Sequence, residues 1–88
     1  MSETNEKYIP LLTEVIKKQI TILGPDIAVI KARSIGSLSV DDDGTVTKID
    51  GDPRKALEGL IDEYVKLSGD IVKMTLSSVF TKYPGLGN

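Results

Sequence analysis

The residues of this chain best suited to chemistry are aspartates gathered around its middle. Three are consecutive and precede a glycine, and two more flank a second glycine: Asp41, Asp42, Asp43, Asp50 and Asp52. If Gly44 takes the sixth position of an EF-hand loop, Asp41, Asp43 and Asp50 fall at the third, fifth and twelfth positions. Calcium requires hard carboxylate oxygens that converge around such a tight glycine turn. The spacing therefore raises the possibility of a weak cation-binding regulatory site.

Three features of the same stretch count against an EF-hand loop. The first position is Ser39 rather than aspartate, and the twelfth is Asp50, whose short side chain reaches a cation less easily than glutamate. Gly51, Asp52 and Pro53 also end any exiting helix before it starts. The simpler interpretation, which we favour, is a hairpin turn with a solvated acidic tip.

Catalytic chemistry has few candidate residues. The chain contains no cysteine and no histidine, which removes disulfides, thiolate metal sites and the commonest general base. No glycine-rich phosphate loop occurs. The aspartates could act as acid and base only if partly buried, and an exposed turn is the opposite environment. We therefore expect no enzyme activity and no cofactor.

Charge is unevenly distributed along the chain. The net charge of −2 argues against nucleic acid as a partner. Residues 7–33 hold five basic and two acidic side chains (+3), whereas residues 41–52 hold one basic and five acidic (−4). These regions are either solvated faces or two complementary patches that associate. The candidate interaction residues are Lys17, Lys18, Lys31, Arg33, Asp41, Asp42 and Asp43.

Nothing in the sequence indicates a membrane partner. Residues 1–7 are polar and acidic, unlike a signal peptide. The apolar runs are far shorter than the ~20 residues that a membrane span needs. We expect a cytoplasmic protein.

The middle of the chain predicts one β-hairpin, with strands at about 37–41 and 45–49. Apolar and polar residues alternate on both sides of the turn, and Gly44 can adopt the positive φ that such a turn needs. The predicted register sets Val40 opposite Val46.

Helical periodicity surrounds the hairpin, with helices predicted at about 9–23, 25–35, 53–67 and 70–82. Pro10 fits only the first turn of a helix, so residues 1–7 are expected to be a flexible end, as are residues 84–88. In the second helix Ile27 and Ile30 and, less cleanly, Val29 and Ala32 mark the expected buried face. In the third and fourth helices, Leu67 and Ile71 are also among the expected buried residues.

Proline and glycine divide the helical segments. An unbroken helix over residues 53–83 would be about 46 Å long at 1.5 Å per residue. A compact chain of 88 residues is only about 30 Å across. We therefore predict corners at Pro25 and Gly69, within a single α+β domain (residues 1–88) that is mostly helical and has the order α-α-β-β-α-α. The alternative is a dimer that covers the overhanging helix.

The stretch from Leu23 to Arg33, LGPDIAVIKAR, resembles the Leu-Gly-Pro-Ile-Ala helix start of small helical modules at the ends of bacterial signalling kinases and cyclases. In those modules a second amphipathic helix opens with an acidic residue and carries Leu and Tyr, as Asp52 to Tyr64 do here. This chain departs from the pattern by an extra residue after Pro25 and by the hairpin between the helices. The resemblance implies an accessory role in signalling or assembly, and it transfers no catalytic residue.

Together these features predict a non-catalytic protein-interaction or dimerisation module. The partner would be a second copy of the chain or another protein. A homodimer could form by burial of an apolar helix face, or by pairing of an outer strand with its symmetry mate, since an isolated hairpin is marginal in water. The two alternatives are the weak cation-binding domain and an accessory subunit of an enzyme.

Overall fold

The computed structural model describes residues 3–83, with side chains from residue 5 onward. In chain order the elements are α1 (Glu3–Leu23), α2 (Pro25–Arg33), β1 (Leu38–Val40), β2 (Val46–Ile49), α3 (Pro53–Ser68) and α4 (Asp70–Lys82). This is the mostly helical α+β fold, in the order that the sequence predicts. The expected flexible end at residues 84–88 lies outside the described residues.

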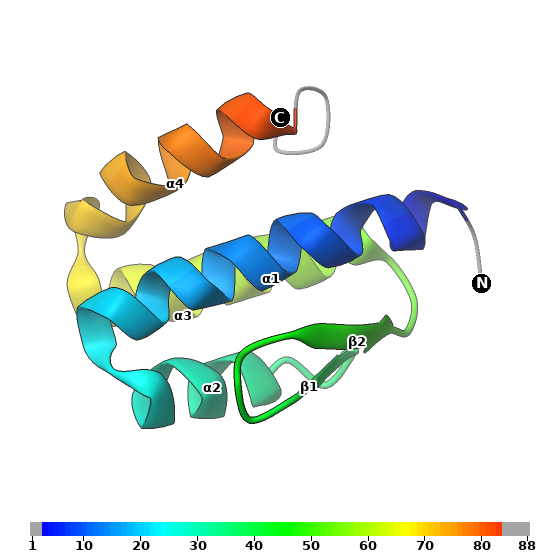
Figure 1. Ribbon diagram of the computed structural model, residues 1–88, viewed down its shortest axis with the longest axis horizontal. Coiled ribbons are helices and arrows are strands. Elements are labelled where there is room, and N and C mark those ends of the chain that lie inside the picture. The colour runs from blue at the N-terminus through cyan, green and yellow to red at the C-terminus, as the bar shows by residue number, and fades with distance from the viewer. Residues whose placement is uncertain (1–2, 84–88) are drawn as a thin grey trace.

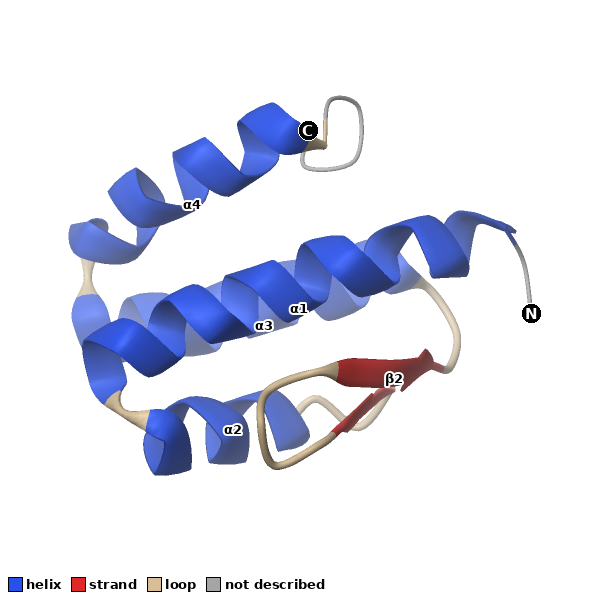
Figure 2. Cartoon of the chain, viewed as in Figure 1, coloured by secondary structure: helices blue, strands red, loops and turns tan. Residues whose placement is uncertain are grey.

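α1 is the central element of the fold. It packs against α2, α3, α4 and β2. In Figure 1, α4 lies on one side of α1, α2 and the hairpin lie on the other side, and α3 runs behind. Figure 2 shows the two strands next to α2, below α1. α4 is thus an outer layer that packs on α1 and α3 with one face only.

The core is mostly aliphatic, as the scarcity of aromatic residues suggests. Burying one such side chain stabilises the fold by roughly 1.5–3 kcal/mol. The largest fully buried apolar side chains come from α1, β2, α3 and α4: Leu11, Leu12, Val15, Ile16, Val46, Leu60, Tyr64, Val72, Leu76 and Val79.

Both predicted corners are present. Gly24 (φ +91°) joins α1 to α2, with Pro25 at the start of α2, and Gly69 (φ +64°) joins α3 to α4. The longest extent of the molecule is 31 Å, far shorter than an unbroken helix from residue 53 would be. Gly69 occupies the N-cap position of α4, and Asp70 is the first residue of the helix. The corners make the fold compact within one chain.

α1 starts earlier than the sequence predicts. It includes residues 3–7, which were expected to be flexible, and Pro10 lies inside the helix rather than in its first turn. A proline within a helix removes one N–H bond and crowds the preceding turn. Distant contacts offset this: the Asn5 Nδ2 atom donates to the carbonyl oxygens of Ile49 (3.1 Å) and Gly51 (3.3 Å). The first turns of α1 are therefore tied to the end of the hairpin.

The buried face of α2 differs in part from the expected one. Ala28, Val29 and Ala32 are buried, whereas Ile27 and Ile30 are exposed. Both sets have helical spacing, so periodicity alone cannot choose between them. The direction of the chain after Gly24 decides which face meets α1. α2 also ends at Arg33, two residues before the predicted end.

The hairpin has the predicted register next to its tip, and the pairing shifts by one residue between Ser39 and Val40. Val40 pairs with Val46, and the Asp41 N–H donates to the Thr45 carbonyl at 2.9 Å. The turn needs glycine at residue 44 for two reasons. Its φ is +91°, and an added Cβ would lie 2.8 Å from the Cδ1 atom of Ile20 on α1. The tip of the hairpin therefore packs directly onto α1.

Candidate functional site

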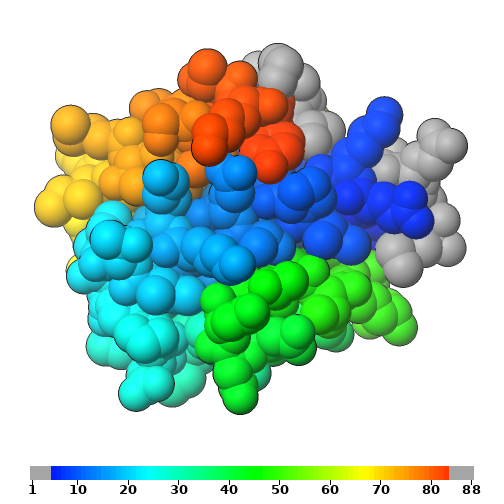
Figure 3. Space-filling view, viewed as in Figure 1, coloured from blue at the N-terminus to red at the C-terminus, as the bar shows by residue number. Residues whose placement is uncertain are grey.

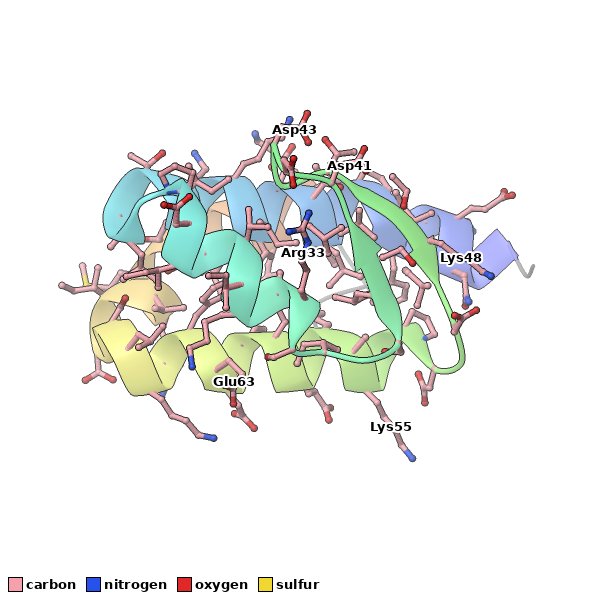
Figure 4. All side chains as sticks on the ribbon, turned by 90° about the horizontal axis from the view of Figure 1, so that it is seen from below. Arg33, Asp41, Asp43, Lys48, Lys55 and Glu63 are labelled. Atoms are coloured by element: carbon pink, nitrogen blue, oxygen red, sulfur yellow. The ribbon has the colours of Figure 1, made fainter. Side chains whose placement is uncertain are left out.

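The aspartates proposed as cation ligands do not converge. Asp41 and Asp43 lie at the tip of the hairpin (Figure 4), whereas Asp50 follows β2 at the other end, where it pairs with Lys48 at 3.4 Å. Asp42 pairs with Arg33 instead. Among the residues that the structure describes, no group of three or more acidic side chains is arranged to hold a metal ion.

Asp43 has a structural role in the turn. Its Oδ1 atom accepts a hydrogen bond of 2.9 Å from the Thr45 N–H. That bond, together with one from the Thr45 side chain, lowers the pKa of the Asp43 carboxyl below its usual 3.8. The position of Asp43 is thus explained by the hairpin itself.

Arg33 connects α2 to the hairpin. Its Nε and Nη2 atoms donate to the Val40 carbonyl at 3.1 and 3.0 Å, and Nη2 also bonds the Asp42 carboxylate at 2.7 Å. Figure 4 shows Arg33 between α2 and the tip. Arg33 and Asp42 border a surface hollow of about 470 Å³ on α2. Arg33 and Asp42 were candidates for contacts between two molecules. In the structure they form an ion pair within one chain.

Both margins of the hairpin are bonded by other parts of the chain. On β1, Arg33 binds the Val40 carbonyl and the Leu38 N–H donates to the Ile35 carbonyl at 3.0 Å. On β2, the Val46 N–H donates to Thr13 Oγ1 on α1 at 3.0 Å. Asn5, described above, occupies the carbonyl of the last β2 residue. These backbone groups are not available to a symmetry-related strand.

The remaining candidate basic residues do not form one cluster: Lys17 lies against the hairpin tip, close to Asp43, whereas Lys31 lies against α3. Lys17 and Lys18 line a shallow hollow of about 280 Å³ with Lys82, which sequence reasoning did not connect to them. Glu14, in the same hollow, pairs with Lys82 at 3.5 Å. Lys31 pairs instead with Glu63 on α3 at 3.8 Å. The structure therefore does not gather the seven candidate interaction residues into one site.

A different surface is notable for its exposed large apolar side chains. Within residues 5–83 six such side chains are exposed, and five of them lie within five residues of Gly24 or Gly69. Both corners are at the same end of the molecule, on the left of Figures 1 and 3. We call these five residues the corner surface: Ile22, Ile27, Leu67, Ile71 and Met74.

The outer face of α4 continues from the corner surface and was not singled out by sequence reasoning. No charged residue occurs from Met74 to Thr81. Four hydroxyl side chains in this segment donate to carbonyl oxygens three or four residues earlier in the same helix, at 2.9–3.0 Å: Thr75, Ser77, Ser78 and Thr81. Their hydroxyl protons are therefore bonded without water. The absence of charged residues from Met74 to Thr81 is the sequence feature that could have identified this face.

Comparison with known proteins adds no further indication of the role of this surface. The chain matches no protein-family model, no curated protein and no solved structure. Among the helices described here, none combines the length and the apolar character of a membrane span. The geometry of the corner surface therefore supplies the argument for function.

Proposed function

We propose that this protein is a non-catalytic protein-interaction module whose docking site is the corner surface. The observation that carries the proposal is the concentration of large apolar side chains at one end of the molecule. Single exposed apolar residues are ordinary, but several of them at one end of a small molecule favour a contact surface there. Met74 (77% exposed) and Ile71 (58%) are the most prominent members of this surface.

The hydrophobic effect is the driving force in this proposal. Covering apolar surface contributes roughly 25 cal/mol per Å² removed from water. Charged residues at the rim would provide orientation rather than most of the affinity. Both signs are present there, because Asp26 lies in the first turn of α2, while Asp70 and Lys73 lie in the first turn of α4 with their charged atoms 4.0 Å apart. A partner with an apolar face and a mixed-charge rim fits this surface.

The proposal differs from charge-driven association. Arg33 and Asp42 are paired within the chain, and the hairpin margins are bonded internally. Neither feature favours pairing through the acidic turn or through an outer strand. An accessory role in signalling or assembly, in the cytoplasm, is part of the same proposal and rests on the sequence resemblance and composition.

Site-specific photo-cross-linking in the native cell tests the proposal. A photoreactive phenylalanine analogue replaces Met74 or Ile27 on the corner surface, and a matched variant carries it at Lys55, on the exposed face of α3 (Figure 4). We expect protein adducts at Met74 and Ile27 and none of the same species at Lys55. Adducts with another protein or with a second copy both support an interaction module. Equal or absent labelling at all three positions overturns the proposal.

A further inference from the structure

α4 presents to solvent a stripe with the spacing of a coiled-coil seam. Ile71, Met74, Ser78 and Thr81 follow one another at intervals of three, four and three residues. This is the alternation of a and d positions in a heptad, which places all four on one helix face. All four are exposed, while the opposite face of α4 is buried on the core. α4 lies along one edge of the molecule, at the top of Figures 1 and 3.

The chemistry of this stripe suits a dry contact. Ser78 and Thr81 already donate their hydroxyl protons to their own helix, so covering them leaves no unsatisfied hydroxyl donor. The charge-free run from Met74 to Thr81 likewise means that no charged group from this segment has to be desolvated. The outer face of α3, by comparison, carries Arg54, Lys55, Glu58 and Lys66.

Side-chain size along the stripe is self-complementary. Its first half carries the large Ile71 and Met74, and its second half carries the small Ser78 and Thr81. In an antiparallel pair of identical helices, a positions of one helix face d positions of the other. Ile71 then faces Thr81 of the second copy, and Met74 faces Ser78. Each large side chain meets a small one, as close packing requires.

We propose that α4 pairs antiparallel with α4 of a second copy of this chain, about a twofold axis. The inference rests on the proposed function and names its partner. Such a contact is isologous, so one stripe supplies both halves of the interface. A different protein would have to provide an uncharged helix with the same order of large and small residues.

The charges at the ends of α4 agree with the antiparallel direction. Asp70 begins the helix and Lys82 ends it. Antiparallel pairing brings the Asp70 end of one copy level with the Lys82 end of the other, and it also aligns the two helix dipoles head to tail. A parallel pair would instead set Asp70 beside Asp70 and Lys82 beside Lys82.

The size of the contact sets its expected strength. α4 has 13 residues, so it is about 20 Å long. One such helix pair, even with the adjoining corner surface, buries less than the roughly 1,600 Å² of a standard interface. We therefore expect a weak, reversible dimer with a dissociation constant in the micromolar range, on the order of 10–100 µM.

Sedimentation equilibrium on the purified chain tests the association. Above its dissociation constant the wild type should approach twice the chain mass of 9.5 kDa. Met74→Lys should raise the dissociation constant at least about tenfold, because it sets a charge against Ser78 of the second copy. Ile30→Lys is the matched control, since Ile30 is exposed to a similar extent (62%) but lies on α2. It should leave the constant unchanged.

Disulfide trapping tests the direction. The chain contains no cysteine, so single variants Met74→Cys and Ser78→Cys report only their own contacts. Mixed under mild oxidation, they should form the heterodisulfide between residues 74 and 78 faster than either homodisulfide. Faster homodisulfides would overturn the antiparallel pairing.

The outcomes separate this inference from the proposed function. A wild-type chain that stays monomeric up to 1 mM overturns the α4 pairing. If Met74 nevertheless cross-links to another protein, the interaction module stands with a different partner. If Met74→Lys and Ile30→Lys weaken the dimer equally, association is not through α4 and the inference is again wrong.

Discussion

The Tyr64 hydroxyl on α3 donates a hydrogen bond of 2.7 Å to the Ala28 carbonyl on α2, across 36 residues of sequence. Tyr64 is completely buried, so this bond joins the two helices inside the core. Tyr64→Phe removes the hydroxyl and keeps the ring, and we expect it to lower the free energy of unfolding by about 1 kcal/mol. Urea denaturation measures the change. Tyr83→Phe, which removes a part-buried hydroxyl, is the control and should have a smaller effect.

Stability should fall in alkaline solution because of the same residue. Burial raises the pKa of Tyr64 well above its usual 10.0. The folded state therefore holds the phenol neutral where the unfolded chain ionises it. The contribution of the neutral Tyr64 phenol to the free energy of unfolding is present in full below about pH 10. It declines as the pH rises above that value. The free energy of unfolding measured from pH 8 to 11 should fall less steeply for Tyr64→Phe than for the wild type. Identical slopes would contradict this assignment.

Alanine substitutions at two glycines with similar positive φ distinguish the energetic cost of backbone strain from the cost of crowded packing. Gly44 and Gly51 have φ of +91° and +84°, but an added Cβ meets atoms within 4 Å only at Gly44. Gly51→Ala should cost roughly 1–2 kcal/mol from strain alone. Gly44→Ala should cost about 1 kcal/mol more, because its Cβ displaces the Ile20 side chain. Equal losses in thermal or urea unfolding would show that the tip of the hairpin does not press on α1.

Gln19 is a polar residue buried among apolar core side chains. It is 0% exposed, and neither atom of its amide has a hydrogen-bond partner among the described residues. A buried unpaired amide costs about 1–3 kcal/mol. Gln19→Met, of similar shape, should therefore raise the free energy of unfolding by about 1 kcal/mol or more, whereas Ile16→Ala, beside it in the core, should lower it by about 2–5 kcal/mol. A destabilised Gln19→Met variant would mean that the amide is satisfied in solution.

Arg33 provides a test of the junction between α2 and the hairpin. Arg33→Met keeps most of the apolar stem and removes the bonds to Val40 and Asp42. The side chain is 46% exposed, so solvent screening limits the loss to about 1 kcal/mol. Lys31→Met, which removes only the long pair with Glu63, should change stability by less. Amide exchange should quicken at Val40 and Asp41 in the Arg33 variant alone.

The hairpin and the corners could be predicted from the sequence because their causes are local. Gly44 sits where the turn needs a positive φ, and Gly24 and Gly69 sit where helices must end. The Asp52 carboxylate caps α3 by accepting from the Arg54 N–H at 2.9 Å, as the Asp-Pro pair suggests. Neighbouring residues alone determine each of these features.

What the sequence did not predict depends on distant contacts. The start of α1 depends on the bonds from Asn5 to backbone more than 40 residues away. In α2, both Ile27 and Val29 lie on apolar faces, and the helix has only nine residues in which a period could be recognised. The exposure of Ile71 follows from how α4 turns at Gly69. Each outcome is decided by tertiary packing, which no short window contains.

The in-chain bonds along both hairpin margins have a consequence for behaviour at high concentration. A two-stranded ribbon with free edges is a template for fibre growth, since any extended chain can add to it. Here Thr13 and Arg33 occupy the positions that an incoming chain would need. We therefore expect the hairpin to be a poor template for fibril growth at high concentration, even though it is the most β-prone segment of the chain.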